Sequence, residues 1–191
     1  MVSTSPHLKQ VFPAPPLVVY RRPHNLRDKL VKARVPDPPS RPTRETPGIK
    51  KCTNVFCVTC PYVVPGNTVK CSITNKEVVV NAPATCKTSN IIYCITCKSC
   101  GQKYVGESSK EIGFRFSQHR SYVNTYQNKI DNDKRTEATG EHFNLPGHSL
   151  SDMQLQMIEK LRDPSRAVRV ERERMYINLF ETENKGINRK T

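Results

Sequence analysis

The stretch NIIYCITCKSCGQKYVGES, Asn90 to Ser108, decides the fold expected of this chain. Residues 91–96 predict a strand, and residues 103–107 predict its antiparallel partner in a hairpin. The turn between them, CKSCGQ, contains two cysteines, which a tight turn does not need. A core strand does not need a tyrosine either, yet each predicted strand carries one. The hairpin is therefore expected to serve a chemical purpose.

The region after the hairpin begins with a predicted helix. Ser108 and Glu111 match a capping box, and the apolar side of the helix recurs at helical spacing. That side comprises Ile112, Phe116, His119 and Val123. Residues 124–141 are polar and are expected to form a loop.

A third strand and a last helix complete the expected domain. The alternation of Met153, Leu155 and Met157 predicts the strand. Asp163 as N-cap and Pro164 at the first helical position predict a helix that ends near Phe180. The order strand, strand, helix, strand, helix indicates an α+β fold over residues 89–191, with a small three-stranded antiparallel sheet flanked by helices.

Two further segments precede this domain. Residues 1–51 hold ten of the fifteen prolines and eleven basic against three acidic residues, which predicts a basic, Pro-rich and largely disordered linker with a short helix near HNLRDKLVKAR. The linker is either a tail without function or an arm that contacts nucleic acid. Residues 52–88 predict a small Cys-rich β module with a hairpin over 68–80, and a module of this size needs a staple.

Composition restricts the partners and the compartment. The chain has 191 residues and a formal charge of +14, which favours a nucleic-acid partner over an anionic membrane surface. On charge alone, a basic protein without a specific ligand is an equal alternative. No apolar run reaches the roughly 20 residues of a membrane span. No signal peptide or Asn-x-Ser/Thr site is present, so the eight cysteines favour metal in a reducing compartment over disulfides in a secreted domain.

The cysteines and histidines predict two zinc sites. Cys97 and Cys100 have the two-residue gap that lets both thiolates reach one tetrahedral ion, and His142 and His148 in EHFNLPGH are the expected partners. A second set is the four cysteines Cys52, Cys57, Cys60 and Cys86, with Cys71 as a rival for the fourth place. Cys94 lies inside a strand and is expected to be a small core residue.

The tyrosines and several other residues are candidates for acting on a nucleic acid. Tyr93 and Tyr104 are expected to emerge near each other on one face of the sheet, and Gly106 would let a bulky ligand approach the backbone. Arg115 and His119 project from one side of their helix. Glu173 falls within an apolar stripe formed by Val170, Ile177 and Phe180, where a carboxylate needs a partner or a metal, whereas Glu171 faces elsewhere.

Taken together, these segments resemble a known family. IIY and YVG look like the paired tripeptides of GIY-YIG endonucleases, EIGFRFSQH resembles their Arg-x-x-x-His helix, and RERMYINLF resembles their glutamate helix. The CxxC between the tyrosines, with EHFNLPGHS downstream, resembles more narrowly the endonuclease of Penelope-like retroelements, in which the core carries a Cys-Cys-His-His zinc site. The residues in GIY and YIG positions depart from the usual pattern, with Ile91 in place of glycine and Val105 in place of isoleucine.

The resemblance implies a role for each residue. Tyr93 or Tyr104 would take a proton from the attacking water, Arg115 would hold the scissile phosphate, and His119 would assist. Glu173 would bind Mg²⁺ or Mn²⁺, and Asn188, in GIN, would orient the groups around the ion. Gly106 and Arg120 would contact DNA, and Zn²⁺ would be structural.

The resemblance also implies a cellular setting. DNA is the expected partner, and a reverse transcriptase part absent from this chain is a second, since no Tyr-x-Asp-Asp signature is present. The expected location is the nucleus. Three hypotheses remain open on the sequence: a divalent-metal-dependent DNA endonuclease, an inactive zinc-stabilised nucleic-acid-binding remnant, and a disulfide-stapled extracellular domain.

Overall fold

The computed structural model describes residues 19–20, 46–132 and 134–190. The chain divides into two units, 1–43 and 44–191, and the account below concerns the second. Most of the predicted basic linker, including its short helix near residues 24–34, lies outside the described residues.

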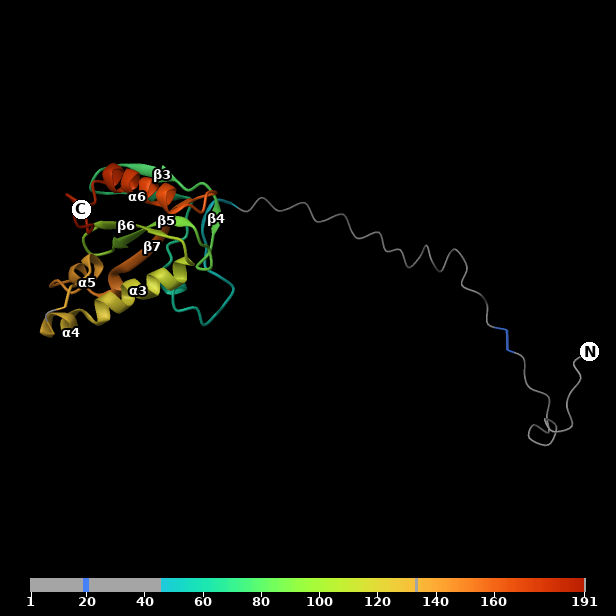
Figure 1. Ribbon diagram of the computed structural model, residues 1–191, viewed down its shortest axis with the longest axis horizontal. Coiled ribbons are helices and arrows are strands. Elements are labelled where there is room, and N and C mark those ends of the chain that lie inside the picture. Colours follow the sequence, from blue (N-terminus) through green and yellow to red (C-terminus); the bar gives the residue numbers. More distant parts are fainter. Residues whose placement is uncertain (1–18, 21–45, 133, 191) are drawn as a thin grey trace, which may run out of the picture. The chain divides into compact units, whose positions relative to one another are not determined.

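A three-stranded antiparallel sheet forms the centre of this unit (Figure 1). Its strands are β5 (Ile91–Cys97), β6 (Lys103–Ser108) and β7 (Met153–Lys160), in the order β6-β5-β7. The central strand β5 is buried at six of its seven positions, so it is apolar throughout rather than alternating. The predicted α+β class and the three strands are confirmed.

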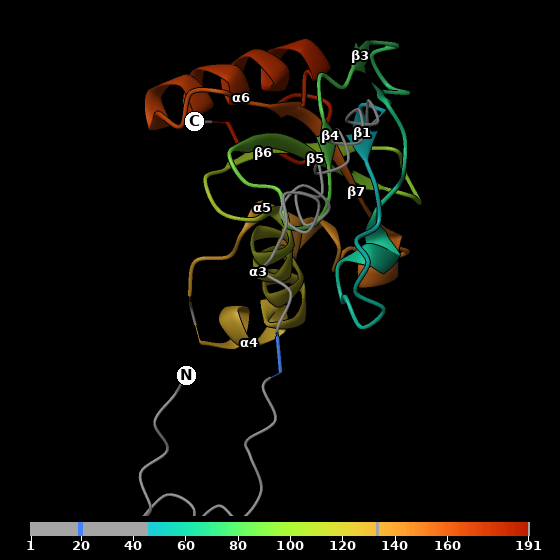
Figure 2. The ribbon, with the colours of Figure 1, turned by 90° about the vertical axis from the view of Figure 1, so that its right-hand side faces the viewer.

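Helices cover both faces of the sheet (Figures 1 and 2). Helix α6 (Arg166–Phe180) lies on one face. On the other lie α3 (Ile112–Asn124), α4 (Tyr126–Asp131) and α5 (Ala138–His142). Two short 3-10 helices complete the helical elements of the described residues, η1 (Cys60–Tyr62) and η2 (Leu150–Asp152). The four residues predicted for the apolar side of α3 are all buried.

Three local predictions were wrong. Ser108 does not cap α3, because it ends β6 and its hydroxyl donates to the carbonyl of Lys110 at 2.8 Å. The expected loop over 124–141 contains α4 and most of α5, which are too short to show a clear period. Helix α6 begins at Arg166 rather than at Pro164, since the carboxylate of Asp163 accepts from the backbone N–H of Ser165 and forms a turn before the helix.

The Cys-rich segment packs on the sheet and shares its core. Strands β2 (Thr68–Lys70) and β3 (Glu77–Val79) form the predicted hairpin, with Asn75 at its turn at φ +53°. A parallel pair joins β1 (Gly48–Ile49) to β4 (Pro83–Ala84), so residues on the two sides of the expected boundary after residue 51 pair with each other. The backbone N–H of Val64 donates to Leu155 of β7 at 3.0 Å. Ile49, Val69 and Val80 belong to the same buried cluster as β5.

None of the helices in the described part of the chain combines the length and the apolar character needed to cross a bilayer.

Candidate active site

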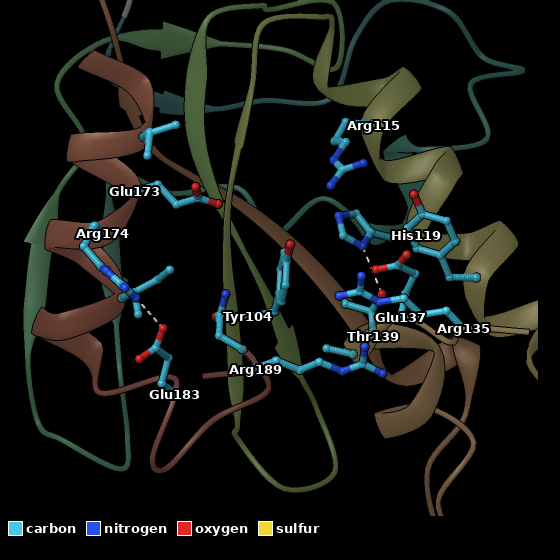
Figure 3. Close-up of a pocket in the computed structure, with 15 residues that line it drawn as sticks. Tyr104, Arg115, His119, Arg135, Glu137, Thr139, Glu173, Arg174, Glu183 and Arg189 are labelled. Carbon is cyan, nitrogen blue, oxygen red and sulfur yellow. Dashed lines mark hydrogen bonds and ion pairs between the residues drawn. The ribbon is translucent and has the colours of Figure 1, made fainter. Parts of the chain in front are cut away.

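A cleft of about 480 Å³ opens above β6, between α3 and α5 on one side and α6 on the other (Figure 3). Figure 3 shows Arg115 and His119 on one wall, Glu173 on the opposite wall and Tyr104 between them. Five of the six residues predicted to be catalytic line this cleft: Tyr104, Arg115, His119, Glu173 and Asn188. They come from four segments that are far apart in the sequence, so only the fold brings them together.

Tyr93 is the sixth predicted residue and lies behind this surface. Its side chain is fully buried, and its ring centroid is 6.5 Å from that of Tyr104. The Oη of Tyr93 lies 2.7 Å from Nε2 of His119 and accepts a hydrogen bond from Nε of Arg115 at 3.2 Å. Tyr93 therefore supports the two cleft-lining residues of α3, whereas Tyr104 itself faces the cleft.

Gly106 makes room for the two tyrosines. The strand register places it opposite Tyr93, and a Cβ there would lie 2.6 Å from Oη of Tyr93 and 2.8 Å from Cε1 of Tyr104. Any larger residue would collide with both rings. The expectation that a ligand approaches the backbone at Gly106 is thus corrected, because the phenol rings fill that space.

The charge states in the cleft follow from burial. Burial and, to a smaller extent, the positive charge of Arg115 lower the pKa of His119 to about 3, so the imidazole is neutral. Its Nδ1 lies 3.0 Å from Oγ1 of Thr139 on α5. Burial raises the pKa of Tyr104 as well, although Arg115 opposes this change. Burial raises the pKa of Tyr93 too, so both phenols are protonated near neutral pH.

Glu173 presents a carboxylate that suits a hard divalent cation. Its Oε1 accepts from the backbone N–H of Glu107 at 3.2 Å. Burial raises the pKa of Glu173, and the negative charge of Glu107 raises it further, so a cation at this point would be stabilising. The predicted apolar stripe is incomplete, because Val170 is 43% exposed at the cleft while Ile177 and Phe180 are buried.

Asn188 connects the C-terminal segment to the sheet. Its side-chain carbonyl accepts from the backbone N–H of Val105, and its amide donates to the carbonyl of the same residue, both at 2.8 Å. Val105 lies between Tyr104 and Gly106 on β6. Asn188 thus holds this strand through its backbone at the point where the tyrosines meet.

The structure brings both predicted ligand sets together. In each set the potential ligand atoms lie within 4.8 Å of one another: Cys52, Cys57, Cys60 and Cys86 in one, and Cys97, Cys100, His142 and His148 in the other. These sets fit zinc, since tetrahedral zinc takes thiolate and imidazole ligands. Cys71, the rival for the first set, lies buried outside it. Cys94 is a buried core residue, as predicted.

Helix α5 links the second ligand set to the cleft. Thr139 contacts His119, and His142, three residues later, belongs to the Cys-Cys-His-His set. Gly140 packs closely on α3, where a Cβ would lie 2.8 Å from the carbonyl oxygen of Tyr122. Thr139 was missed in the sequence because it falls in the polar region expected to be a loop, and no local pattern marks it.

Two further arginines differ from the sequence predictions. Arg120 was predicted to contact DNA, and Arg135 was not predicted as a site residue. Arg120 does not line the cleft; its guanidinium donates to the carbonyl of Val58 at 3.3 Å and lies 5.4 Å from the ring centroid of Tyr62. Arg135 lines the cleft beside Glu137, and both precede α5 in the region that was expected to be a loop.

A phenol, a permanent cation and a carboxylate around one cleft are groups suited to cleaving a phosphodiester, as in a nuclease. The chain belongs to the GIY-YIG family, since residues 89–188 match the family described as the GIY-YIG catalytic domain. Such a domain implies a nucleic-acid substrate. Searches among curated proteins and among solved structures returned no match.

Proposed function

We propose that the protein is a divalent-metal-dependent DNA endonuclease that hydrolyses phosphodiester bonds. The observation that carries this proposal is the shared cleft, which collects a phenol, a guanidinium, a neutral imidazole and a carboxylate from separate elements (Figure 3).

In the proposed reaction, Arg115 holds the scissile phosphate. Its charge is permanent, and its planar donors match two phosphate oxygens. Tyr104 takes the proton of the attacking water, because Tyr104 rather than Tyr93 lines the cleft. For this step Tyr104 must be a phenolate that has already lost its own proton to solvent; its raised pKa disfavours that form, and the nearby positive charge of Arg115 favours it. His119 is neutral and hydrogen-bonded to Tyr93, and Tyr93 in turn accepts from Arg115. His119 therefore helps to hold Arg115 and the tyrosines in position.

Glu173 would hold one Mg²⁺ or Mn²⁺ at the opposite wall. When bound, such an ion neutralises charge on the phosphate and on the leaving oxygen. The raised pKa of Glu173 supports this assignment, since a carboxylate in a partly buried acidic setting gains from a cation. Asn188 would support the site by holding the backbone of β6 at Val105.

Zinc is proposed as a structural ion at both ligand sets. The Cys-Cys-His-His ion would fix the hairpin turn against α5, and the four-cysteine ion would brace the segment 52–86. Neither set lines the cleft, so neither ion would touch the reacting phosphate.

The wider setting is proposed from sequence resemblance and charge. The CxxC between the two tyrosines, with its distant histidines, supports an origin in Penelope-like retroelements. On that basis the chain would act in the nucleus, alongside a reverse transcriptase part, with residues 1–51 as the connecting linker and residues 52–88 as a zinc module. The charge of +14 supports DNA as the partner.

Nicking of supercoiled plasmid tests the proposal. The zinc-loaded protein should nick in Mg²⁺ or Mn²⁺ and should not nick without either ion. Glu173→Gln and Arg115→Ala should each lose at least about 100-fold in rate while still binding DNA. Glu171→Gln and Arg166→Ala are the matched controls, because both residues are exposed and neither lines the cleft.

Two outcomes of the nicking assay would contradict the proposal. If the intact protein nicks no DNA in either ion but binds it, the protein is a nucleic-acid-binding remnant rather than an enzyme. If Glu171→Gln loses as much activity as Glu173→Gln, the cleft is not the catalytic site.

A further inference from the structure

The loop that precedes Thr59 displays large apolar side chains to solvent. Val55 is 88% exposed, Phe56 87% and Val58 59%. Among the described residues of this unit, Val55 and Phe56 are the most exposed large apolar side chains; Val79 follows at 68%. Three neighbouring apolar side chains that contact no core form a surface suited to a partner.

The backbone beneath these side chains is fixed. The backbone N–H of Phe56 donates to the side-chain carbonyl of Asn54 at 3.0 Å, and that of Cys57 donates to the backbone carbonyl of Asn54 at 3.1 Å. The carbonyl of Val58 accepts from Arg120. Cys57 belongs to the four-cysteine set, so the loop is held at that end as well. The apolar tip, defined as Val55, Phe56 and Val58, therefore projects from a rigid base.

Two lysines adjoin cysteines of the set to which Cys57 belongs. Lys51 precedes Cys52 and Lys87 follows Cys86, and the sulfur atoms of these cysteines and of Cys57 lie within 4.8 Å of one another. Both lysines are exposed. Lys51, Phe56 and Lys87 are each next in sequence to a cysteine of the four-cysteine set. Residues 50–88 contain five lysines and one acidic residue, Glu77, which is paired with Lys70 at 3.0 Å. This charge balance favours a polyanion as the partner.

The tip is also connected to the cleft through α3. The backbone N–H of Gly113 donates to the carbonyl of Cys86 at 2.8 Å, and the hydroxyl of Thr59 donates to the carbonyl of Gly113 at 3.5 Å. Arg115, the proposed phosphate ligand, follows two residues later. A nucleic acid held at Arg115 thus lies on the helix whose first turn supports the apolar tip.

We propose that the apolar tip is a second contact with duplex DNA, in which Phe56 inserts at a base step while Lys51 and Lys87 hold the flanking phosphates. Apolar wedges act in this way by unstacking a step and bending the duplex, and neighbouring cations contribute the sequence-independent attraction. The inference rests on the nucleic-acid substrate of the proposed function and adds a binding element outside the cleft.

The test measures binding rather than cleavage. The full chain, with its zinc content checked, is titrated into duplex DNA carrying 2-aminopurine, without Mg²⁺ or Mn²⁺ and without a chelator. Phe56→Ala should weaken binding about tenfold and abolish the rise in 2-aminopurine fluorescence that reports unstacking. Lys51→Gln should weaken binding and lower the slope of affinity against salt by about one.

Matched controls lie on the β2–β3 hairpin. Val79→Ala removes another exposed apolar side chain, and Lys76→Gln removes another exposed lysine. If Phe56→Ala binds DNA as tightly as Val79→Ala does, the inference fails. It also fails if Phe56→Ala leaves DNA binding intact and weakens binding to vesicles of anionic lipid instead.

These outcomes are separate from those of the nicking assay. A protein that nicks normally but binds independently of Phe56 would overturn this inference and leave the proposed function standing. Phe56-dependent binding without any nicking would support the inference and reject the enzyme.

Discussion

The Oη of Tyr93 and the Nε2 of His119 lie 2.7 Å apart in the buried wall of the cleft. The other nitrogen of His119 contacts Thr139, and Arg115 donates to the same phenol oxygen. Burial and the charge of Arg115 lower the pKa of His119 to about 3, so this network contains a neutral imidazole. Three properties of this network can be tested: the effect of the neutral His119 on stability, the separate roles of Tyr93 and Tyr104, and the contact of His119 with Thr139 of α5.

Acidification should destabilise the fold through His119. The unfolded chain takes up a proton at the ordinary histidine pKa of 6.5, whereas the folded chain does so only near 3. Between these values the unfolded state holds more protons, so the free energy of unfolding falls as the pH decreases, by at most about 1.4 kcal/mol per unit. Urea unfolding at several pH values should show a shallower decline for His119→Gln. Parallel curves for the two proteins would contradict the buried, neutral histidine.

The two tyrosines should separate in kinetics and stability. Tyr104→Phe should lower the nicking rate by about 10²- to 10⁴-fold, because Tyr104 faces the cleft as the proposed base. Tyr93→Phe should retain more activity and lower the free energy of unfolding by about 1–2 kcal/mol, since it leaves buried partners unsatisfied. Plasmid nicking and urea unfolding of both variants provide the measurement. Greater loss of activity in Tyr93→Phe would reverse the assignment.

Thr139 should act through its hydroxyl. Thr139→Val removes the partner of Nδ1 of His119 at nearly constant volume, and an unpartnered buried group costs about 1–3 kcal/mol. The NMR signals of the His119 ring nitrogens should shift in this variant, and nicking should slow. Thr139→Ser keeps a hydroxyl and should restore both. If valine and serine behave alike, Thr139 fills space and does not orient the imidazole.

Each chain should bind two zinc ions. Cys97→Ser and Cys86→Ser should each lose one ion by metal analysis, because the two ligand sets share no residue. Cys71→Ser and Cys94→Ala should retain both ions, since neither residue belongs to a set. Loss of the ion at Cys97 should also slow nicking, because α5 carries both His142 and Thr139. Zinc loss in Cys71→Ser would restore Cys71 as a ligand.

The sequence by itself determined the elements whose patterns are local. Two short β-rich segments, 91–96 and 103–107, joined by a tight turn predicted the hairpin, and helical spacing placed Phe116 and His119 on one side of α3. The two-residue gap between Cys97 and Cys100 indicated a metal ligand pair, and the turn-flanked histidines of EHFNLPGH, His142 and His148, were the expected partners. Such signals survive in sequence because residues a few positions apart are held together by the secondary structure itself.

Only the tertiary structure decided which groups meet, and which of them reach the cleft. Tyr93 and Tyr104 look equivalent in the hairpin, yet packing against α3 buries the first and leaves the second facing the cleft. The space beside Gly106 is filled by the two phenol rings. Thr139 contacts His119 from α5, a helix too short to show a helical period in the sequence. The exposure of Phe56 is likewise invisible in sequence. Burial at these positions depends on contacts between distant segments, so the local pattern around them does not encode it.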